Sequence, residues 1–304
     1  MASIRDLLLP VDNKDDTKVV VKKEDEAAGK TDIIPTETTR FLVEFILDVI
    51  CPYCYIGFKN LKTAIETYKA RHPNTNFEIV CTPFLLHPLA ARSAYDKSDY
   101  LIAGTRGPAY WVGPGEAAGI NFTWAGRTGS TRDAHKLLRF ALESAPTTTR
   151  GAAHNRRGTS APPSPPSSSH AGTRCSPASS PSATNGNNNN TPARGPALQL
   201  RLLEALFHAH HESDGDISDP SFLAETASAA TGFATAQMRA VIEDAGEVWG
   251  RAVSALVAEV SSPRGLAVRA VPTFVVNDHY VIGGVQSVGF LVDEFERIRR
   301  GGGR

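Results

Sequence analysis

Two apolar patterns of different period follow each other directly near residue 50 of the chain. Residues 41–47, FLVEFIL, are rich in β-favouring side chains and have the length of a buried strand. From Tyr55 onward, apolar residues recur every three to four positions with charged residues between them, which is the spacing of one helix face. The pattern therefore predicts a central strand that leads into a helix, and the tetrapeptide CPYC, residues 51–54, lies at the junction.

The same periodicities predict the remaining elements. Residues 77–86 predict a second strand, parallel to the first and reached by a right-handed crossover. A helix is expected from Ser130, because Ser130 and Asp133 have the spacing of a capping box. Residues 267–277 and 280–282 predict an antiparallel hairpin. Further helices are expected over residues 197–212, 218–231, 234–261 and 288–299.

Composition separates two polar segments from the rest. Residues 1–39 are highly charged, and residues 145–196 are rich in Ser, Pro, Asn and Gly. Both segments are expected to be disordered, because they cannot bury enough apolar surface to offset the entropy of ordering. Residues 40–88 and 266–300 then form the two halves of one α/β fold. Residues 89–265 form a helical subdomain inserted between them, which the second polar segment interrupts.

Charge and hydropathy narrow the function classes. The chain has 32 basic and 32 acidic residues, so it shows no bias towards nucleic acid. Its start lacks the apolar core of a secretory signal, and no stretch is long enough to span a membrane. A cytoplasmic protein is the expectation, and in that compartment a CxxC pair is more often catalytic than a permanent crosslink.

The CPYC pair predicts thiol chemistry. Free N–H groups and the helix dipole favour the thiolate form of Cys51, and Cys54, one turn further on, can attack a mixed disulfide formed there. Half of a zinc site and two unreactive buried cysteines are the alternatives, but no second paired motif completes a zinc site. Cys81 is expected to be a small buried residue, and Cys175 an exposed thiol without a designed role.

Two further features bear on this site. Glu44 and Asp48 fall on one side of the first strand, where a carboxylate could accept the proton of Cys54, although capping of the next helix is the favoured role for Asp48. Pro272 interrupts a β-rich run. A cis Val271–Pro272 bond beside the active site and an ordinary edge-strand proline explain it equally well.

A group of histidines is a weaker candidate site. His208 and His211, with His210 beside them, have a helical spacing that could hold a metal. No carboxylate or cysteine stands at clear ligand spacing, so a partly exposed helix end is the favoured interpretation and no metal is expected.

The order of elements, together with three motifs, resembles the DsbA-like branch of the thioredoxin superfamily, including its cytosolic FrnE-type proteins. The motifs are DVICPYCYIG at residues 48–57, DAHKLLRFA at 133–141 and VPTFVVNDHYVIGGVQ at 271–286. The resemblance covers residues 40–299 apart from the polar segment. It implies a thioredoxin fold with an inserted α-helical subdomain.

The resemblance also implies roles for individual residues. Cys51 would be the attacking thiol and Cys54 the resolving thiol, while Pro52 and Tyr53 tune the couple. The backbone of Val271, beside a cis Pro272, would pair with a bound peptide or with glutathione. Related proteins often carry an acid six residues before the first cysteine, where this chain has Phe45.

Three functions are compatible with these features. The first is a thiol–disulfide oxidoreductase acting on protein or small-molecule disulfides, with glutathione as a candidate co-substrate and no other cofactor. The second is a glutathione-dependent transferase or isomerase resembling the kappa-class and 2-hydroxychromene-2-carboxylate isomerase types, which usually carry serine at the first cysteine position. The third is a non-catalytic peptide-binding module. The retained Cys51 and Cys54 favour the first.

Overall fold

The computed structural model describes residues 38–92, 95–102, 108–144, 195–263 and 265–301. The disorder expected for residues 1–39 and 145–196 therefore concerns segments that lie almost wholly outside the described residues. Thr39 and Pro196, at the edges of these segments, already belong to regular elements. The division into domains stays a prediction.

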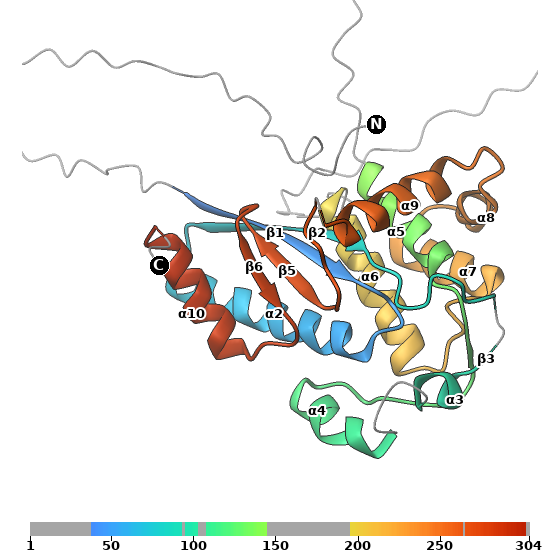
Figure 1. The fold of residues 1–304 in the computed structure, drawn as a ribbon, viewed down its shortest axis with the longest axis horizontal. Helices are drawn as coiled ribbons and strands as arrows, with labels where there is room; N and C mark the ends of the chain where they lie inside the picture. Colours follow the sequence, from blue (N-terminus) through green and yellow to red (C-terminus); the bar gives the residue numbers. More distant parts are fainter. Residues whose placement is uncertain (1–37, 93–94, 103–107, 145–194, 264, 302–304) are drawn as a thin grey trace, which may run out of the picture. The chain divides into compact units, whose positions relative to one another are not determined.

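Four strands form a mixed sheet in the order β2-β1-β5-β6 (Figure 1). Strands β1 (Thr39–Leu47) and β2 (Thr75–Pro83) are parallel and are joined by helix α2 (Pro52–Arg71). Strand β5 (Thr273–Val276) is antiparallel to β1, and β6 (Tyr280–Gly283) is antiparallel to β5. The predicted α/β class and the antiparallel hairpin are confirmed.

One face of the sheet is covered by α2 and by α10 (Val288–Arg299), which lie side by side in Figure 1. Phe41 of β1 points to this face and contacts Tyr68 of α2 and Phe295 of α10, with ring centroids 5.6 and 5.4 Å apart. The alternation of buried residues along β1 follows from this packing, because every second side chain faces the two helices.

The helical part of the chain lies on the β2 side of the sheet. Its elements are β3 (Tyr95–Asp96), α3 (Lys97–Ile102), the 3₁₀ helix η1 (Pro108–Trp111), α4 (Val112–Ala117), β4 (Arg127–Thr128), α5 (Arg132–Glu143), α6 (Pro196–His211), α7 (Pro220–Thr231), α8 (Thr235–Glu243) and α9 (Val248–Ser261). Val80 of β2 packs with Leu142 of α5 and Leu256 of α9 in a buried cluster. This cluster joins the helices to the sheet. Among the described residues, no helix is long and apolar enough to cross a bilayer.

The side chain of Gln199 connects helix α6 to the free edge of β2. The amide of Gln199 accepts a hydrogen bond from the Cys81 N–H at 2.8 Å and donates one to the Cys81 carbonyl at 3.0 Å. Gln199 therefore satisfies both backbone groups that the edge strand leaves unpaired at Cys81. This fixes the position of α6 along the sheet.

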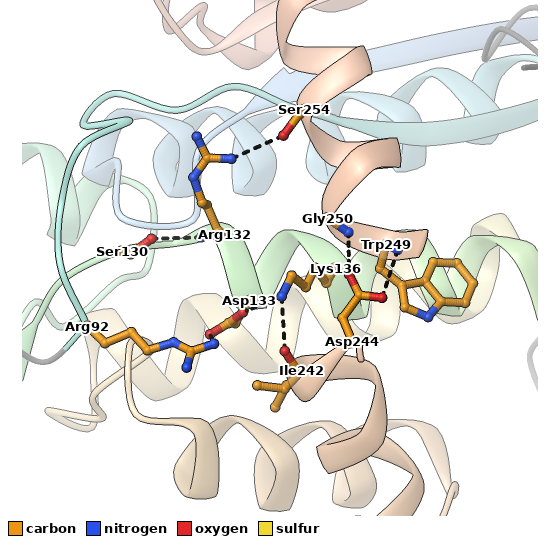
Figure 2. A network of polar contacts seen from close by, with 10 residues as sticks. All are labelled: Arg92, Ser130, Arg132, Asp133, Lys136, Ile242, Asp244, Trp249, Gly250 and Ser254. Atoms are coloured by element: carbon orange, nitrogen blue, oxygen red, sulfur yellow. Dashed lines mark hydrogen bonds and ion pairs between the residues drawn. The ribbon is translucent and has the colours of Figure 1, made fainter. Parts of the chain in front are cut away.

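The capping box predicted at the start of α5 is not formed. The residue before the helix is Thr131, which makes no capping hydrogen bond through its side chain. Asp133 instead forms ion pairs with Arg92 at 2.6 Å and with Lys136 at 3.0 Å (Figure 2). The expected acid is thus used in a tertiary contact, which spacing along the sequence does not reveal.

The single helix expected over residues 234–261 is two helices, because Asp244 interrupts it. Asp244 has a positive φ of 47°, and its carboxylate accepts the N–H groups of Trp249 at 3.1 Å and Gly250 at 2.6 Å in the first turn of α9 (Figure 2). Lys136 of α5 donates to the carbonyl of Ile242 at 3.0 Å. These bonds tie α5, α8 and α9 together.

Candidate active site

Both cysteines of the CPYC motif lie where β1 gives way to α2. Cys51 is the N-cap of α2, and Pro52 is its first helical residue, where a missing N–H leaves no donor unpaired. The N–H groups of Cys54 and Tyr55 donate to the Cys51 carbonyl at 3.0 and 3.3 Å, which closes the first turn. The two free thiols are therefore brought together at the positive end of the helix dipole.

The two thiols differ in their surroundings. Cys51 exposes 4% of its surface, whereas Cys54 exposes none. Burial, a side-chain hydrogen bond with Cys51 and the negative charges of Cys51 and Asp48 raise the pKa of the Cys54 thiol, and a backbone hydrogen bond at Asp48 offsets part of this rise. Cys54 is thus held in the protonated form, and Cys51 is the thiol nearer to solvent.

A loop at the start of β5 faces Cys51. The Val271–Pro272 bond is cis, and the Cys51 thiol donates to the Val271 carbonyl at 3.8 Å. The predicted cis bond is confirmed, while the alternative of a proline within an edge strand is wrong, because β5 begins at Thr273. Both halves of the fold thus contribute to one site.

Helix α2 has a glycine where this loop approaches. A Cβ atom added to Gly57 would lie 3.0 Å from Pro272 Cγ and 3.4 Å from Phe274 Cζ. Gly57 therefore permits the close contact between α2 and the loop that carries Val271.

Tyr53, the second of the two residues between the cysteines, contacts residues of the predicted helical insertion. The Tyr53 ring, 39% exposed, lies 4.5 Å from the ring of buried Trp111. The hydroxyl groups of Tyr53 and Tyr110 are 3.3 Å apart. Trp111 also contacts Phe122, at 5.9 Å. An aromatic cluster from residues 110–122 therefore borders the site on the Tyr53 side.

Asp48 has a role that the sequence did not favour. The carboxylate does not cap α2. Its Oδ2 accepts the Leu86 N–H at 2.8 Å, and its Oδ1 lies 3.4 Å from Nε2 of His135 in α5. Asp48 and His135 expose 1% and 3% of their surfaces. The expected capping role is wrong because the chain after β2 folds back onto Asp48, so that the second strand ends at Pro83 and not at residue 86.

Glu44, the other carboxylate expected on this side of β1, forms a hydrogen bond with Thr82 of β2. Its Oε1 accepts the Thr82 hydroxyl at 2.7 Å. Of the two carboxylates, Asp48 is the one whose charge acts on Cys54.

The end of α6 supports the turn before Cys51. His211 is hydrogen-bonded through Nε2 to the Val49 carbonyl at 3.0 Å and stacks on Tyr55, with ring centroids 5.6 Å apart. The Tyr55 hydroxyl donates to Glu212. The partly exposed helix end predicted for the three histidines holds for His208, which is exposed, but is wrong for His210 and His211, which are buried. His211 is buried against the turn before Cys51, whereas His210 is hydrogen-bonded to the Gly215 carbonyl and lies beside Lys97.

The histidines do not converge on a metal position. His208 is exposed, while His210 and His211 are buried. Among the described residues, no group of three or more His, Cys, Asp or Glu side chains is arranged to hold a metal ion. His135 and His211 are the site residues whose contacts sequence reasoning missed. The motif DAHKLLRFA marked His135 as part of a resemblance but did not show what it contacts.

The sheet order, the CxxC pair at the start of α2 and the cis-proline loop opposite it define a protein of the thioredoxin fold. A family model for the DSBA-like thioredoxin domain matches residues 42–156 and 190–296, more than half of the chain. The chain therefore belongs to the DSBA-like thioredoxin family. This confirms the predicted thioredoxin fold and the resemblance seen in the motifs.

Two solved structures show the same fold at low sequence identity. A probable DsbA oxidoreductase from Streptomyces coelicolor is 19% identical, with a TM-score of 0.60, over 86% of this chain and 91% of that chain. A putative protein disulfide isomerase from Nitrosomonas europaea is 11% identical, with a TM-score of 0.53, over 86% and 99%. A cytosolic disulfide reductase, DsbM from Pseudomonas aeruginosa with GSH, is 12% identical, with a TM-score of 0.47, over 85% and 97%. No curated protein matches the chain significantly.

Proposed function

We propose that this protein is a thiol–disulfide oxidoreductase in which Cys51 is the nucleophile and Cys54 the resolving thiol. The observation that carries the proposal is the placement of Cys51 at the N-cap of α2, with Cys54 one turn deeper and the Val271 carbonyl 3.8 Å from the Cys51 sulfur. Membership of the DSBA-like family is consistent with disulfide oxidoreductase or isomerase chemistry.

The exchange proceeds in two steps. The Cys51 thiolate attacks one sulfur of a partner disulfide, the partner's S–S bond breaks, and one partner thiolate leaves. Cys54 then loses its proton, and its sulfur attacks Cys51 Sγ. The bond between Cys51 and the partner breaks, and the second partner thiolate leaves. The dithiol is oxidised by two electrons and the partner disulfide is reduced. The reverse order oxidises a dithiol partner.

The difference in exposure supports this order of attack. Cys51 is the thiol nearer to solvent, and Cys54 is fully buried behind it. A partner disulfide therefore reaches Cys51 first. Tyr53, Val271 and Pro272 border this approach, and we assign them to the binding of the partner, with Pro52 tuning the couple. The partner is a protein or small-molecule disulfide or thiol, glutathione is a candidate co-substrate, and a cytoplasmic location is part of the proposal.

Serine variants of the cysteines test the mechanism. Cys51→Ser is expected to abolish turnover of a disulfide substrate, while Cys54→Ser is expected to accumulate a mixed disulfide that mass spectrometry detects on intact protein. Cys81→Ser is the matched control, because Cys81 is buried in β2 and burial raises the pKa of its thiol. Equal activity in the Cys51 and Cys54 variants contradicts the mechanism.

The reduction potential of the Cys51–Cys54 pair then determines whether the protein reduces or oxidises its partners. The chain is equilibrated with glutathione redox buffers, and the fraction of the Cys51–Cys54 disulfide is measured. A potential near about −270 mV indicates a reductase, and one near about −120 mV an oxidant. Activity that survives Cys54→Ser and requires glutathione supports the transferase or isomerase function instead. Partner binding that survives both serine changes supports the peptide-binding module.

A further inference from the structure

Two consecutive residues at the end of α6 contact the chain on both sides of the CPYC motif. His211 is the last residue of α6, and its Nε2 lies 3.0 Å from the carbonyl of Val49, two residues before the first cysteine. Glu212 follows directly, and its Oε1 accepts the hydroxyl of Tyr55, the residue after the second cysteine. Figure 1 shows the end of α6 beside the start of α2. Both cysteines therefore lie between two contacts that come from one helix end.

The contact on the first side belongs to the turn that leads into the motif. The Cys51 N–H donates to the Asp48 carbonyl at 3.1 Å, so residues 48–51 form a β-turn with Val49 at its first inner position. Val49 is fully buried, and a buried carbonyl needs a hydrogen-bond donor. Because a carbonyl only accepts, His211 carries its proton on Nε2 and donates it. The imidazole thus fixes the peptide plane of this turn.

The same two residues hold a third segment, which belongs to the aromatic cluster bordering the site. The Asn121 N–H donates to Glu212 Oε2 at 3.1 Å, and the Thr123 N–H donates to the His211 carbonyl at 2.8 Å. Phe122 lies between these two donors, and its ring is 5.6 Å from the imidazole of His211. The end of α6 therefore fixes the aromatic cluster and the start of α2 relative to each other.

We propose that His211 and Glu212 form a clamp that positions Cys54 for its attack on the mixed disulfide at Cys51. Both clamp residues act through the residues that flank the motif, so they are positioning residues. The inference rests on the proposed dithiol function and adds the end of α6 to the groups that determine its rate.

The clamp matters for the second attack more than for the first. The first attack requires that a partner disulfide reach Cys51, the thiol nearer to solvent. The second is intramolecular, and its rate depends on how often the Cys54 sulfur lies in line with the bond that breaks. A displacement of about 1 Å can slow such a step about 100-fold. The first turn of α2 keeps its own backbone bonds, so the loss of one clamp contact is expected to cost about 10-fold.

Single-turnover kinetics on the full chain separate the two attacks. The probe is the symmetric disulfide of thionitrobenzoate, which releases one coloured thiolate when Cys51 attacks and a second when Cys54 resolves the adduct. The parent chain carries Cys175→Ser, and Cys81 is buried. A parent that shows no second release refutes the dithiol function itself, whatever the clamp variants do.

Variants of His211 test the contact with the turn. His211→Leu is expected to leave the first release within about twofold of the parent and to slow the second about 10-fold. His211→Gln keeps an N–H donor in place of Nε2 and is expected to restore the second release. His210→Leu is the matched control, because His210 is buried in the same helix turn but is hydrogen-bonded to the Gly215 carbonyl at 3.0 Å. The control should slow neither release.

Tyr55→Phe tests the contact on the other side of the motif, because it removes only the hydroxyl that Glu212 accepts. The second release is again expected to slow about 10-fold, with the first release unchanged. Tyr68→Phe is the matched control, since it removes another hydroxyl from a buried tyrosine of α2 that lies further from the cysteines. This control should change neither release.

Equilibration with glutathione gives a readout that a general loss of stability would not move. A clamp that holds the two sulfurs together raises the effective concentration of one thiol for the other and so favours the Cys51–Cys54 disulfide. His211→Leu should therefore need about 10-fold more oxidising glutathione to reach the midpoint, which is a potential about 30 mV less negative. His210→Leu should keep the potential of the parent.

Three results overturn the proposal. One is a second release within about twofold of the parent in both His211→Leu and Tyr55→Phe. Another is equal slowing of both releases in His211→Leu. The third is a His210→Leu control that slows the second release as much as His211→Leu does, because general loosening of α6 then explains the effect. Urea unfolding checks each variant, and if His211→Leu does not fold, the comparison of Tyr55→Phe with Tyr68→Phe decides.

Discussion

Gly57 offers a quantitative test of how closely α2 and the Val271–Pro272 loop are packed. In Gly57→Ala, the new Cβ would lie 3.0 Å from Pro272 Cγ and 3.4 Å from Pro272 Cβ. Ordinary carbon contacts lie at about 3.5–4.0 Å, so the loop or the helix must move by several tenths of an ångström. Such overpacking in a filled core costs about 1–3 kcal/mol.

The helix itself gains from the same change. Alanine is favoured over glycine inside a helix by about 1 kcal/mol, which offsets part of the overpacking cost. Gly289 in the first turn of α10 is the matched control, because its added Cβ would meet no atom within 4 Å. Gly289→Ala should therefore show the helix gain alone. The expected difference in free energy of unfolding between the two variants is about 1–3 kcal/mol, with Gly57→Ala the less stable.

Urea unfolding of both variants and of the parent measures this difference. The midpoint and slope of each curve give the free energy of unfolding. The rate at which a disulfide probe reacts with Cys51 is a second readout, and it should change in Gly57→Ala because Pro272 is displaced. If the two alanine variants are stabilised equally, α2 and the loop are not in close contact and the description of the site is wrong.

Three further predictions follow from other contacts. Gln199→Leu should lower the free energy of unfolding by about 2–4 kcal/mol in urea titrations, because it leaves the buried N–H and C=O of Cys81 unpaired, and no loss of stability would contradict the role of this edge contact. Replacing residues 146–193 by a short flexible linker should leave disulfide turnover within about twofold of the parent. This segment joins the end of α5 to the start of α6, whereas the start of α5 and the end of α6 contact the site, about 10 Å further along the sheet. Burial and the nearby charge of Lys97 lower the pKa of His210 to about 4, so stability should fall as the pH drops from about 6.5, the unfolded value, towards 4, by about 3 kcal/mol in total. Between pH 7 and pH 5, the free energy of unfolding should fall by about 2 kcal/mol of this total in the parent and in His208→Gln, and by less in His210→Gln. An equal fall in all three proteins would refute the prediction.

Local signals along the chain were sufficient for the main elements of the fold. The change of period at Cys51 located the end of β1 and the start of α2, because a buried strand and an amphipathic helix repeat their apolar residues differently. Pro272 marked an irregular position in the β-rich run, but a cis bond beside the cysteines and an edge-strand proline explained it equally well until the structure showed the cis bond. The motifs at residues 48–57, 133–141 and 271–286 also indicated the family without any knowledge of tertiary contacts.

Only the tertiary structure assigned the partners of buried polar groups. Asp48 and Asp133 both occupy positions that suggest helix capping, yet one faces His135 and the other pairs with Arg92 and Lys136. The burial of His211 likewise depends on α6 reaching the Val49 carbonyl. Apart from the Asp133–Lys136 pair, each of these contacts joins residues far apart in the chain. A carboxylate or imidazole can satisfy its hydrogen bonds locally or at a distance, and packing selects between them because an unpaired buried polar group is costly.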